Sequence, residues 1–537
     1  MSMKRTPGKW ASCSCQILAC GLFCSSLSGL RAADNWLWAK SIGGMWGTRV
    51  GVDGSGNSYV LGQFYGQETN GGVTLQPQTN TANGFLVKYD PSGNLRWTRQ
   101  VGAEGRAMHV DSGGIYLAGY IAGKARIGSV DFQSQMNRQV MFVARYDSTG
   151  DVLWARKVGE ADRAFVNCVS VDSGGNYYVA GNFHGGGSFG GSSGPIDFTV
   201  STSGSDDMFI AKYSPNGAKL WVQTLGGIAH DSVDDIVVSD SGECFIMGHL
   251  GELSDNVRIG STNIERQLLA TKFLGKLNPQ GEFEWVKEIN VGRSGYIFPY
   301  DSLAIDQAAN VYVVGVFQNS AKIASASLRS TNASDFYVAK FDRTGGLAWA
   351  RSGGVCCEND VRGVAVDKNG DLYVTGLFSY QAFLSGNQPS QRVPVLRKYS
   401  QTGELLGEEY GSTPVGCNGI AIDPAGNLVI AGTLGLGGGS LGQAQLSADA
   451  KTGLAGFIAK LRPFIRAGIA RVQLISQKEV RISVQGFAES NYRIETSTNL
   501  LQWASFLTWP GANGVFEFSD FPTPNTPAKF YRVITLP

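Results

Sequence analysis

The stretch Lys88-Tyr89-Asp90-Pro91-Ser92-Gly93-Asn94-Leu95-Arg96-Trp97 decides the fold, because its pattern recurs along the chain. Each version is a strand-like segment ending in Lys or Arg, then a turn whose glycine lies four residues before a tryptophan position. Later versions occupy residues 145–154, 212–221, 276–285, 340–349 and 398–407, where Gly407 replaces the tryptophan. Counted from Trp38, these positions are separated by 59, 57, 67, 64, 64 and 58 residues. A period of this kind indicates a repeat architecture.

A second marker runs in phase with the first. Asp53-Gly54-Ser55-Gly56-Asn57 leads into an apolar strand, and equivalents begin at Asp111, Asp172, Asp240, Asp306, Asp367 and Asp423. Each repeat therefore reads as four short strands, and the Asp/Gly/Asn turns suit tight hairpins. Seven hairpin markers, and seven strands that end in Lys or Arg, the last at Lys460, predict an all-β, seven-bladed β-propeller with four-stranded blades.

The two ends of the repeat region predict how the ring closes. The last repeat ends at residues 457–461 without a tryptophan strand, whereas Trp36–Ile42 forms an unmatched one near the amino terminus. We therefore expect the N-terminal strand to complete the seventh blade and close the ring, which removes open sheet edges. After Pro463 the repeat stops, and alternating apolar residues across 468–537 predict about six strands in a small C-terminal β-sandwich.

The repeat resembles a known family. Trp-Ala-Lys/Arg followed by Gly-Gly, then Val-Asp-x-x-Gly-Asn-x-Tyr-Val-x-Gly, then Phe-x-x-Lys-Tyr-Asp, is similar to the bacterial SBBP (seven-bladed β-propeller) repeat over about residues 34–463. The resemblance implies the fold. It supplies no shared catalytic motif, so it implies no activity.

Composition and the amino terminus narrow the function classes. Glycine is 72 of 537 residues, charged residues are 17% and the net charge is +1. Without a basic excess, nucleic-acid binding is not expected. Lys4, Arg5 and Lys9 precede an uncharged segment that ends at Ala33, which predicts a signal peptide over residues 1–33. A membrane anchor, or a lipoprotein signal at Cys20, is the alternative.

The expected domains are therefore the signal peptide (1–33), the propeller (34–463) and the C-terminal module (464–537). We expect a secreted or extracytoplasmic protein, or a cell-surface attached one, with no transmembrane segment in the mature chain. The C-terminal module is interpreted either as an attachment module or as a plain stabilising domain. In an oxidising compartment, Cys356 or Cys357 could form a disulfide with Cys417, since they occupy equivalent connections of adjacent blades; free thiols are the alternative.

Regular positions are interpreted as scaffold. The turn aspartates resemble fragments of a calcium loop but lack its acidic twelfth residue, so we expect structural turns. The recurring tryptophans are expected to fill gaps between blades rather than to form a sugar platform.

Candidate binding residues are those that break the symmetry. Five residues before the hairpin aspartate, or at a similar place, each repeat carries a different polar residue: Arg49, Arg106, Asn167, Asp235, Asp301, Arg362 and Asn418. This polar ring is expected near the channel mouth, where it could bind a small polar ligand or a peptide; ordinary solvated charge is the alternative. A second candidate is an aromatic anchor patch of Tyr296, Phe298 and Tyr300, which could equally pack against a neighbouring blade.

Evidence for chemistry is weaker. Asp234 and Asp235, near Asp231 and His230, form the densest polar cluster and could act as an acid/base pair. His184 and His230 are expected on one face, but two histidines do not indicate a metal site, and His109 and His249 are expected to pack. No nucleophile elbow, HExxH motif or phosphate loop is present.

The sequence therefore favours a non-catalytic binding scaffold with a protein or carbohydrate partner and no cofactor. A propeller enzyme that acts on a polysaccharide, and a surface adhesin, are the alternatives. The enzyme hypothesis requires Asp234, Asp235 or His230 to meet a second acid or base at the channel mouth.

Overall fold

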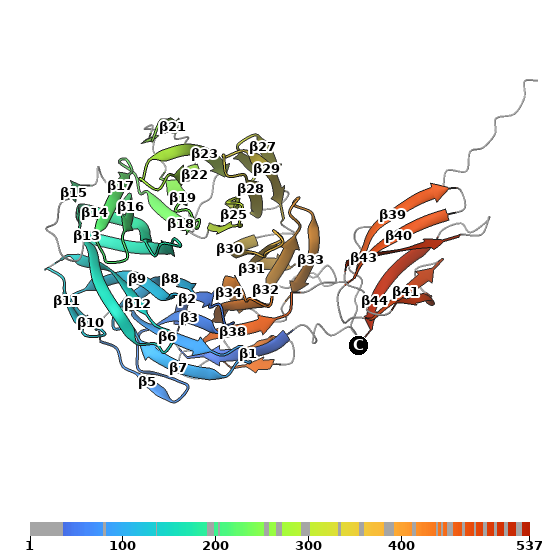
Figure 1. Cartoon of the computed structure of the whole chain (residues 1–537), viewed down its shortest axis with the longest axis horizontal. Helices are drawn as coiled ribbons and strands as arrows, with labels where there is room; N and C mark the ends of the chain where they lie inside the picture. The colour runs from blue at the N-terminus through green and yellow to red at the C-terminus, as the bar shows by residue number, and fades with distance from the viewer. Residues whose placement is uncertain are drawn as a thin grey trace, which may run out of the picture. The chain divides into compact units, whose positions relative to one another are not determined.

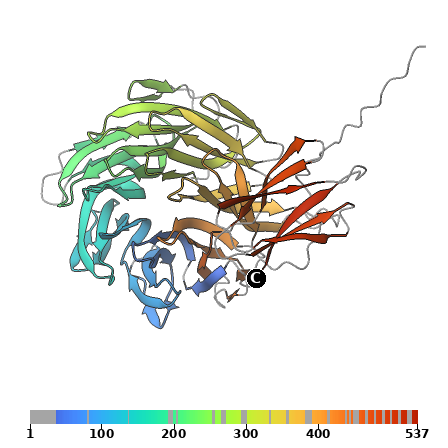
Figure 2. The same ribbon diagram turned by 45° about the vertical axis from the view of Figure 1, so that its right-hand side comes forward.

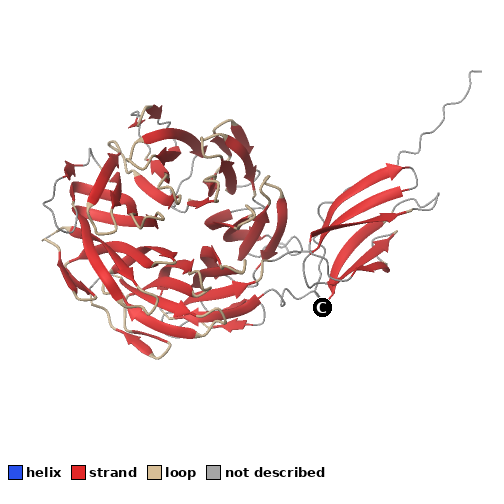
Figure 3. Ribbon diagram, in the orientation of Figure 1, coloured by secondary structure: helices blue, strands red, loops and turns tan. Residues whose placement is uncertain are grey.

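The computed structural model describes residues 36–536 with gaps, and the regular elements of the described residues are all strands (Figure 3). The gaps fall at residues 44, 79–81, 136, 191–197, 202–204, 252–256, 265–270, 292–300, 331–333, 354–358, 381–390, 411–414, 436–438, 442–443, 448–454, 464–467, 477–478, 487–490, 499–501, 510–513 and 522–528. No helix of the described part is long and apolar enough to cross a membrane. The described residues form two compact units, one ending at Pro463 and one beginning at Phe464.

Antiparallel sheets with one strand order recur along the first unit (Figures 1 and 2). Three of them are β2 (Met45–Val52), β3 (Ser58–Phe64), β6 (Asn83–Tyr89) and β7 (Leu95–Gln100); β24 (Ser302–Ile305), β25 (Val311–Phe317), β28 (Asp335–Phe341) and β29 (Leu347–Ser352); and β30 (Asn359–Val366), β31 (Leu372–Tyr380), β32 (Gln391–Tyr399) and β33 (Leu405–Tyr410). The strand order within each sheet follows the chain, as expected for a series of hairpins.

Two larger sheets contain the same order with additions. The first joins β8 (Glu104–Asp111), β9 (Gly114–Ala122) and β12 (Gln139–Tyr146) to β14 (Tyr177–Phe189), β16 (Asp207–Tyr213) and β17 (Lys219–Leu225) through the long strand β13 (Val152–Val171). The second is β18 (Ser232–Val238), β19 (Cys244–Leu250), β22 (Thr271–Leu277) and β23 (Phe283–Val291), extended by the hairpin β26 (Ser320–Ile323) and β27 (Ala326–Arg329).

The long strands correct one expectation. The glycine-rich sequence from Phe183 to Gly194 predicts a flexible loop, but Phe183–Phe189 lies within β14. It pairs with β13 on one side and with β15 (Phe198–Ser201) on the other, because backbone hydrogen bonds to two neighbours offset the low strand preference of glycine. Residues 191–197 lie outside the described part.

Short hairpins, which a four-strand repeat does not predict, occupy the connections between second and third strands. They are β4 (Glu68–Asn70) with β5 (Val73–Leu75), β10 (Lys124–Ile127) with β11 (Val130–Gln133), β20 (Val257–Ile259) with β21 (Thr262–Ile264), and β36 (Gly439–Leu441) with β37 (Ala444–Leu446). They enlarge the face of the molecule on which these connections lie.

The amino-terminal strand pairs with the end of the repeat region, as predicted. Strand β1 (Trp36–Ile42) runs antiparallel to β38 (Ala455–Leu461), with Ala39 opposite Ala459. The resulting sheet continues through β35 (Leu428–Leu434) to β34 (Val415–Ile422). The apolar core confirms the junction, because Ile42 and Ile458 pack in one cluster with Val60 and Phe85 of the first repeat.

The first strands of successive sheets also contact one another around a centre (Figure 1). In order, the contacts run from β2 to β8, β13, β18, β24, β30 and β34, and from β34 back to β2. The arrangement is therefore propeller-like, with the first strands innermost.

The recurring tryptophans fasten each repeat to the next one. In five cases the indole Nε1–H donates to a carbonyl in the Gly-containing turn of the following repeat: Trp38 to Pro91 (3.1 Å), Trp97 to Ser148 (3.2 Å), Trp221 to Pro279 (3.0 Å), Trp285 to Arg343 (3.3 Å) and Trp349 to Gln401 (2.8 Å). The first of these spans the junction between the last repeat and the first. The predicted packing role of the tryptophans is confirmed.

The hairpin aspartates act within their own repeats. Asp53 Oδ1 accepts from the backbone N–H groups of Ser55 and Asn57, and Asp53 Oδ2 accepts from the hydroxyl of Tyr59. In other repeats the aspartate also pairs with the lysine that ends the third strand, as in Lys460–Asp423 at 2.6 Å. The two sequence markers run in phase because they contact each other.

The second unit contains two three-stranded sheets. Their orders are β39 (Gly468–Ser476), β40 (Glu479–Gly486), β43 (Gly514–Asp520), and β42 (Ala504–Trp509), β41 (Asn491–Ser497), β44 (Phe530–Leu536). Ile482 and Val484 of one sheet share a core with Ile494 of the other. Six strands were expected here, and six are described.

The tryptophan contacts make a prediction about the turn glycines. Gly403 has φ +79°, and a Cβ built there would lie 2.6 Å from Trp349. Gly426 has φ +85°, but a Cβ there would meet nothing within 4 Å. Gly426→Ala should therefore cost only the left-handed backbone strain, about 1–2 kcal/mol, whereas Gly403→Ala should cost about 1–3 kcal/mol more through overpacking. Equal losses in urea unfolding would contradict the packing of the indole on this turn.

Candidate functional site

The predicted ring residues lie on or next to the innermost strands. Arg49, Arg106, Asn167, Asp235, Arg362 and Asn418 are in β2, β8, β13, β18, β30 and β34, and Asp301 directly precedes β24. Several of them coincide with interruptions of the strand register, namely Arg106, Asn167, Arg362 and Asn418. In β18 the interruption falls at Asp234 instead. A β-bulge turns one side chain out of the regular alternation, so these residues project differently from their neighbours.

Most ring side chains bond across to the next repeat. Asn167 Nδ2 donates to the carbonyl of Val233 at 3.0 Å, and Arg362 Nη1 donates to Asn418 Oδ1 at 2.9 Å. Asp235 Oδ2 accepts from the backbone N–H of Leu303 at 2.8 Å. Arg106 lies over the ring of Phe165 at 4.8 Å. The side chains of these ring residues therefore join neighbouring repeats.

Arg49 and Asp301 differ in their surroundings. Arg49 is exposed, and its Nε donates to the carbonyl of Arg106 at 3.4 Å. Asp301 is buried and forms an ion pair of 2.5 Å with Lys272 Nζ. Burial raises the pKa of Asp301 to about 6, although Lys272 opposes the shift.

A buried polar cluster occupies the junction between β18, β19 and β24. Asp234 Oδ1 lies 2.8 Å from His249 Nδ1, with side-chain exposures of 0% and 4%. Burial disfavours the charged imidazole, but the carboxylate of Asp234 outweighs it and raises the pKa of His249. Asp234 thus meets a second titratable group, as the enzyme hypothesis required, but the pair is closed to a polymeric substrate.

His230 meets an acid that the sequence did not single out. Its Nδ1 lies 3.1 Å from Oδ2 of Asp206, and His184 Nδ1 lies 3.3 Å from Oδ1 of the same carboxylate. Arg163 Nη2 also contacts Asp206 Oδ1, at 2.7 Å. The two histidines therefore lie on one face, as expected, and they share a buried aspartate.

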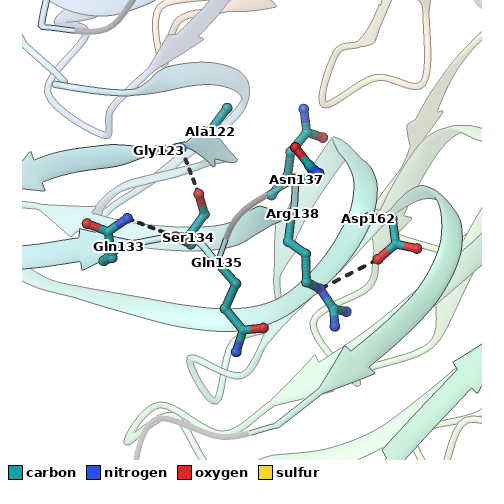
Figure 4. Close-up of a pocket in the computed structure, with 9 residues that line it drawn as sticks. Ala122, Gly123, Gln133, Ser134, Gln135, Asn137, Arg138 and Asp162 are labelled. Atoms are coloured by element: carbon teal, nitrogen blue, oxygen red, sulfur yellow. Dashed lines mark hydrogen bonds and ion pairs between the residues drawn. The ribbon is translucent and has the colours of Figure 1, made fainter.

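A pocket of about 540 Å³ is lined in part by Asp162, the residue that precedes Arg163 in β13 (Figure 4). Its lining is Ala122, Gly123, Gln133, Ser134, Gln135, Asn137, Arg138, Gln139 and Asp162. These residues come from the connection between β9 and β12 and from the middle of β13. Arg138 Nη2 donates to the carbonyl of Gly186 at 2.7 Å, whereas its buried Nε has no hydrogen-bond partner among the described residues and lies 3.7 Å from Asp162 Oδ1. The pocket therefore combines several side-chain amides with one cation and one carboxylate.

The remaining predictions concern thiols and aromatic residues. Cys417 is buried and forms no disulfide with another described cysteine, and burial raises the pKa of its thiol to about 12, so the thiol is a poor nucleophile. Its proposed partners, Cys356 and Cys357, lie outside the described residues, as do Tyr296, Phe298 and Tyr300. Within the described part, no group of three or more His, Cys, Asp or Glu side chains is placed to hold a metal ion.

Sequence reasoning missed Asp206 and the pocket for a definable reason. Both lie in the connections that vary between repeats, where no repeating marker aligns them. The one available signal is the acidic pair Asp206-Asp207 at the start of a third strand, in the repeat that also contains His184.

Comparisons with known proteins point to the architecture. No family model matches the chain. An uncharacterized WD repeat-containing protein of Acanthamoeba polyphaga mimivirus is 22% identical over 509 residues, covering 74% of this chain and 36% of the relative. The regulatory protein FlaEY of Caulobacter vibrioides is 28% identical over 228 residues, covering 40% of this chain and 22% of the relative. The chain thus spans well under half the length of these relatives.

Two solved structures are also similar. BamB from Moraxella catarrhalis is 10% identical, with 79% of this chain and 99% of that chain covered and a TM-score of 0.34. The Pan2 WD40 domain of Neurospora crassa is 9% identical, with 78% and 89% covered and a TM-score of 0.33. The WD-repeat relative and the observed sheet order agree that this chain is an all-β, propeller-like repeat protein.

The carboxyl group of Asp235 is expected to make the protein less stable as the pH rises from acid toward neutral. Burial raises the pKa of Asp235 to about 6 against an ordinary value of 3.8, so the folded state holds a proton that the unfolded state has lost between these values. Protonated Asp235 therefore adds to the free energy of unfolding, and this contribution is lost as the pH rises from the ordinary pKa through the raised one. Asparagine does not titrate, so Asp235→Asn shows no such loss. The destabilisation by Asp235→Asn should shrink by about 1–3 kcal/mol between about pH 4 and pH 7.

Asp53→Asn provides the control of opposite sign. Burial disfavours the charged form of Asp53, but hydrogen bonds from Asn57 and Tyr59 lower its pKa overall. Its contribution is lost as the pH falls, so the cost of Asp53→Asn should instead grow from acid to neutral pH. Because the pKa of Asp53 lies below its ordinary value of 3.8, its contribution is lost mainly below about pH 4, so denaturant unfolding from about pH 2.5 to about pH 7 measures both effects. A cost of Asp235→Asn that is constant or grows with pH would contradict the assignment.

Proposed function

We propose that the chain is a secreted or surface-attached scaffold that binds a polymeric partner without turnover. Its repeat region is a seven-bladed β-propeller closed by β1, and residues 464–537 are a small β-sandwich that attaches or stabilises it. The strand pairing of β1 with β38, the closed series of first-strand contacts and the two three-stranded sheets support this architecture.

The pocket shown in Figure 4 carries the functional proposal. Its lining contains four side-chain amides, Gln133, Gln135, Asn137 and Gln139, each with donor and acceptor atoms. Amide groups of this kind match the mixed donors and acceptors of a polyhydroxylated or peptide ligand. Among its described lining residues there is a single carboxylate and no imidazole or thiol, so these side chains favour binding over acid–base chemistry.

The enzyme alternative rests on a different observation. His230 and Asp206 form an imidazole–carboxylate pair at 3.1 Å, and the His230 side chain is 52% exposed. Such a pair could act as a general base in hydrolysis of a polysaccharide. Release of reducing ends from a polysaccharide by the full chain, abolished in His230→Gln, would favour this alternative over the scaffold.

The pocket makes a direct binding prediction. In a glycan and peptide array screen of the full chain, Gln135→Ala and Asn137→Gly should each weaken binding to the ligands found by about tenfold, as expected for one lost hydrogen bond to a ligand. Asn137 has φ +63°, so glycine preserves the backbone there. Arg126→Ala removes an exposed side chain of β10 outside the pocket lining and should change nothing. Binding that survives both pocket variants unchanged would overturn the proposed site.

Secretion is tested separately. Expression of the full chain in a secreting bacterial host should yield an extracytoplasmic protein that lacks residues 1–33, because signal peptidase removes such leaders. Intact mass measurement of the mature protein determines the cleavage position. A cytoplasmic protein that retains Lys4, Arg5 and Lys9 would contradict the signal-peptide assignment.

A further inference from the structure

Three basic side chains converge on one buried carboxylate at the junction of β13, β14 and β18. Arg163 and His184 are opposite each other in the register of β13 and β14, so their side chains leave the same face. Both reach Oδ1 of Asp206, at 2.7 and 3.3 Å. His230, from the segment before β18, reaches Oδ2 at 3.1 Å. We call Arg163, His184 and His230 the basic cluster.

Burial separates the acid from the bases. The side chain of Asp206 is 1% exposed, whereas Arg163, His184 and His230 are 52%, 45% and 52% exposed. Asn182 Nδ2 also donates to Asp206 Oδ2, at 3.0 Å. The aspartate therefore contacts one nitrogen atom of each base, while about half of each basic side chain remains exposed.

One carboxylate does not neutralise three bases. Burial disfavours ionised Asp206, but hydrogen bonds from His230 and Arg163 outweigh it and hold the pKa of Asp206 below its ordinary value. The aspartate therefore stays ionised in mild acid. Counted together with Asp206, the basic cluster has no net charge when both imidazoles are neutral and two positive charges when both are protonated.

Further titratable groups flank the basic cluster. Asp207 and Asp231, which adjoin Asp206 and His230 in the chain, are buried, and the carboxylate of Asp231 accepts from the backbone N–H groups of Gly227 and Gly251. On β19, the His249 ring lies 6.0 Å from that of His230 and pairs with Asp234. On β13, Asp162 belongs to the wall of the pocket in Figure 4, and Arg138 lies 3.7 Å from it. Phe165 lies beneath Arg163 at 5.8 Å. Of these groups, Asp162 is an exposed carboxylate, and Arg138 offsets it.

The pocket and the basic cluster share one ribbon. Asp162 and Arg163 are consecutive in β13, and Gly186, whose carbonyl holds Arg138, is two residues from His184 in β14. An extended ligand can therefore meet the amide groups of the pocket and the basic cluster together. Repeated hydroxyl groups suit the first, and repeated acidic groups suit the second.

We propose that this ribbon binds an acidic polysaccharide, with its carboxylate or sulfate groups on Arg163, His184 and His230, and that binding tightens as the pH falls. The proposal rests on the scaffold function proposed above and names its ligand class. Protonated imidazoles add attraction for the ligand, whereas Arg163 contributes at every pH.

The test measures binding of the full chain to polygalacturonate, dextran sulfate, neutral dextran and polyglutamate at constant ionic strength. We expect binding to at least one acidic polysaccharide, about tenfold tighter near pH 5.5 than near pH 7.5, and none to dextran. The carboxylated and sulfated polymers distinguish the two anionic groups. Equal affinity at both pH values, equal binding of polyglutamate, or no binding of either acidic polysaccharide overturns the proposal.

Variants assign the effect to the cluster. His184→Gln/His230→Gln should remove the pH dependence, and Arg163→Gln should weaken binding about tenfold at both pH values. Arg258→Gln, an exposed arginine of β20, is the matched loss of charge and should have no effect. Thermal melting confirms that each variant is folded. Binding of dextran that depends on Gln135 and not on the cluster would keep the scaffold function and overturn this inference.

Discussion

The contact between an indole N–H and the turn of the next repeat is the interaction on which the rest of the structure depends. It recurs at Trp38, Trp97, Trp221, Trp285 and Trp349, and each time the indole joins one repeat to its successor. One such hydrogen bond contributes about 1 kcal/mol. Its geometric effect is larger, because a tryptophan over a turn glycine leaves little freedom for neighbouring sheets to shift. The contact from Trp38 to Pro91 places the amino-terminal strand under the same constraint.

The innermost strands contain the polar side chains that differ from one repeat to the next. Bulges at Arg106, Asn167, Arg362 and Asn418 aim side chains across to the neighbouring repeat, where they bond to different partners. The polar residues that looked like free binding groups therefore contribute to the closure of the ring. Arg163 and His184, which remain about half exposed and contact Asp206, lie on the long strands β13 and β14. Strand β13 also contributes Asp162 to the amide-lined pocket.

Features that several repeats share could be predicted from the sequence, whereas features present in a single repeat could not. The in-phase Asp and Lys markers and the unmatched Trp36–Ile42 strand gave the sheet order and the pairing with β38, because each marker makes the same contact in several repeats. The cluster around Asp206 could not be predicted in this way. Its members come from β13, from β14, from the segment before β16 and from the segment before β18, and only the fold brings them together. Likewise, no pattern showed that Phe183–Phe189 would form a strand, since glycine has weak strand preference and its neighbours decide.

Disulfide trapping of the closing pair tests the central claim, a ring sealed by the amino-terminal strand, most directly. Ala39 and Ala459 are opposite each other in β1 and β38, so Ala39→Cys/Ala459→Cys should cross-link within one chain under mild oxidation. Ala339 occupies the equivalent third-strand position of another repeat, where it pairs with Ala350, so Ala39→Cys/Ala339→Cys is the matched control and should not cross-link. A cross-link that forms equally in both variants, or in neither, would contradict closure by β1.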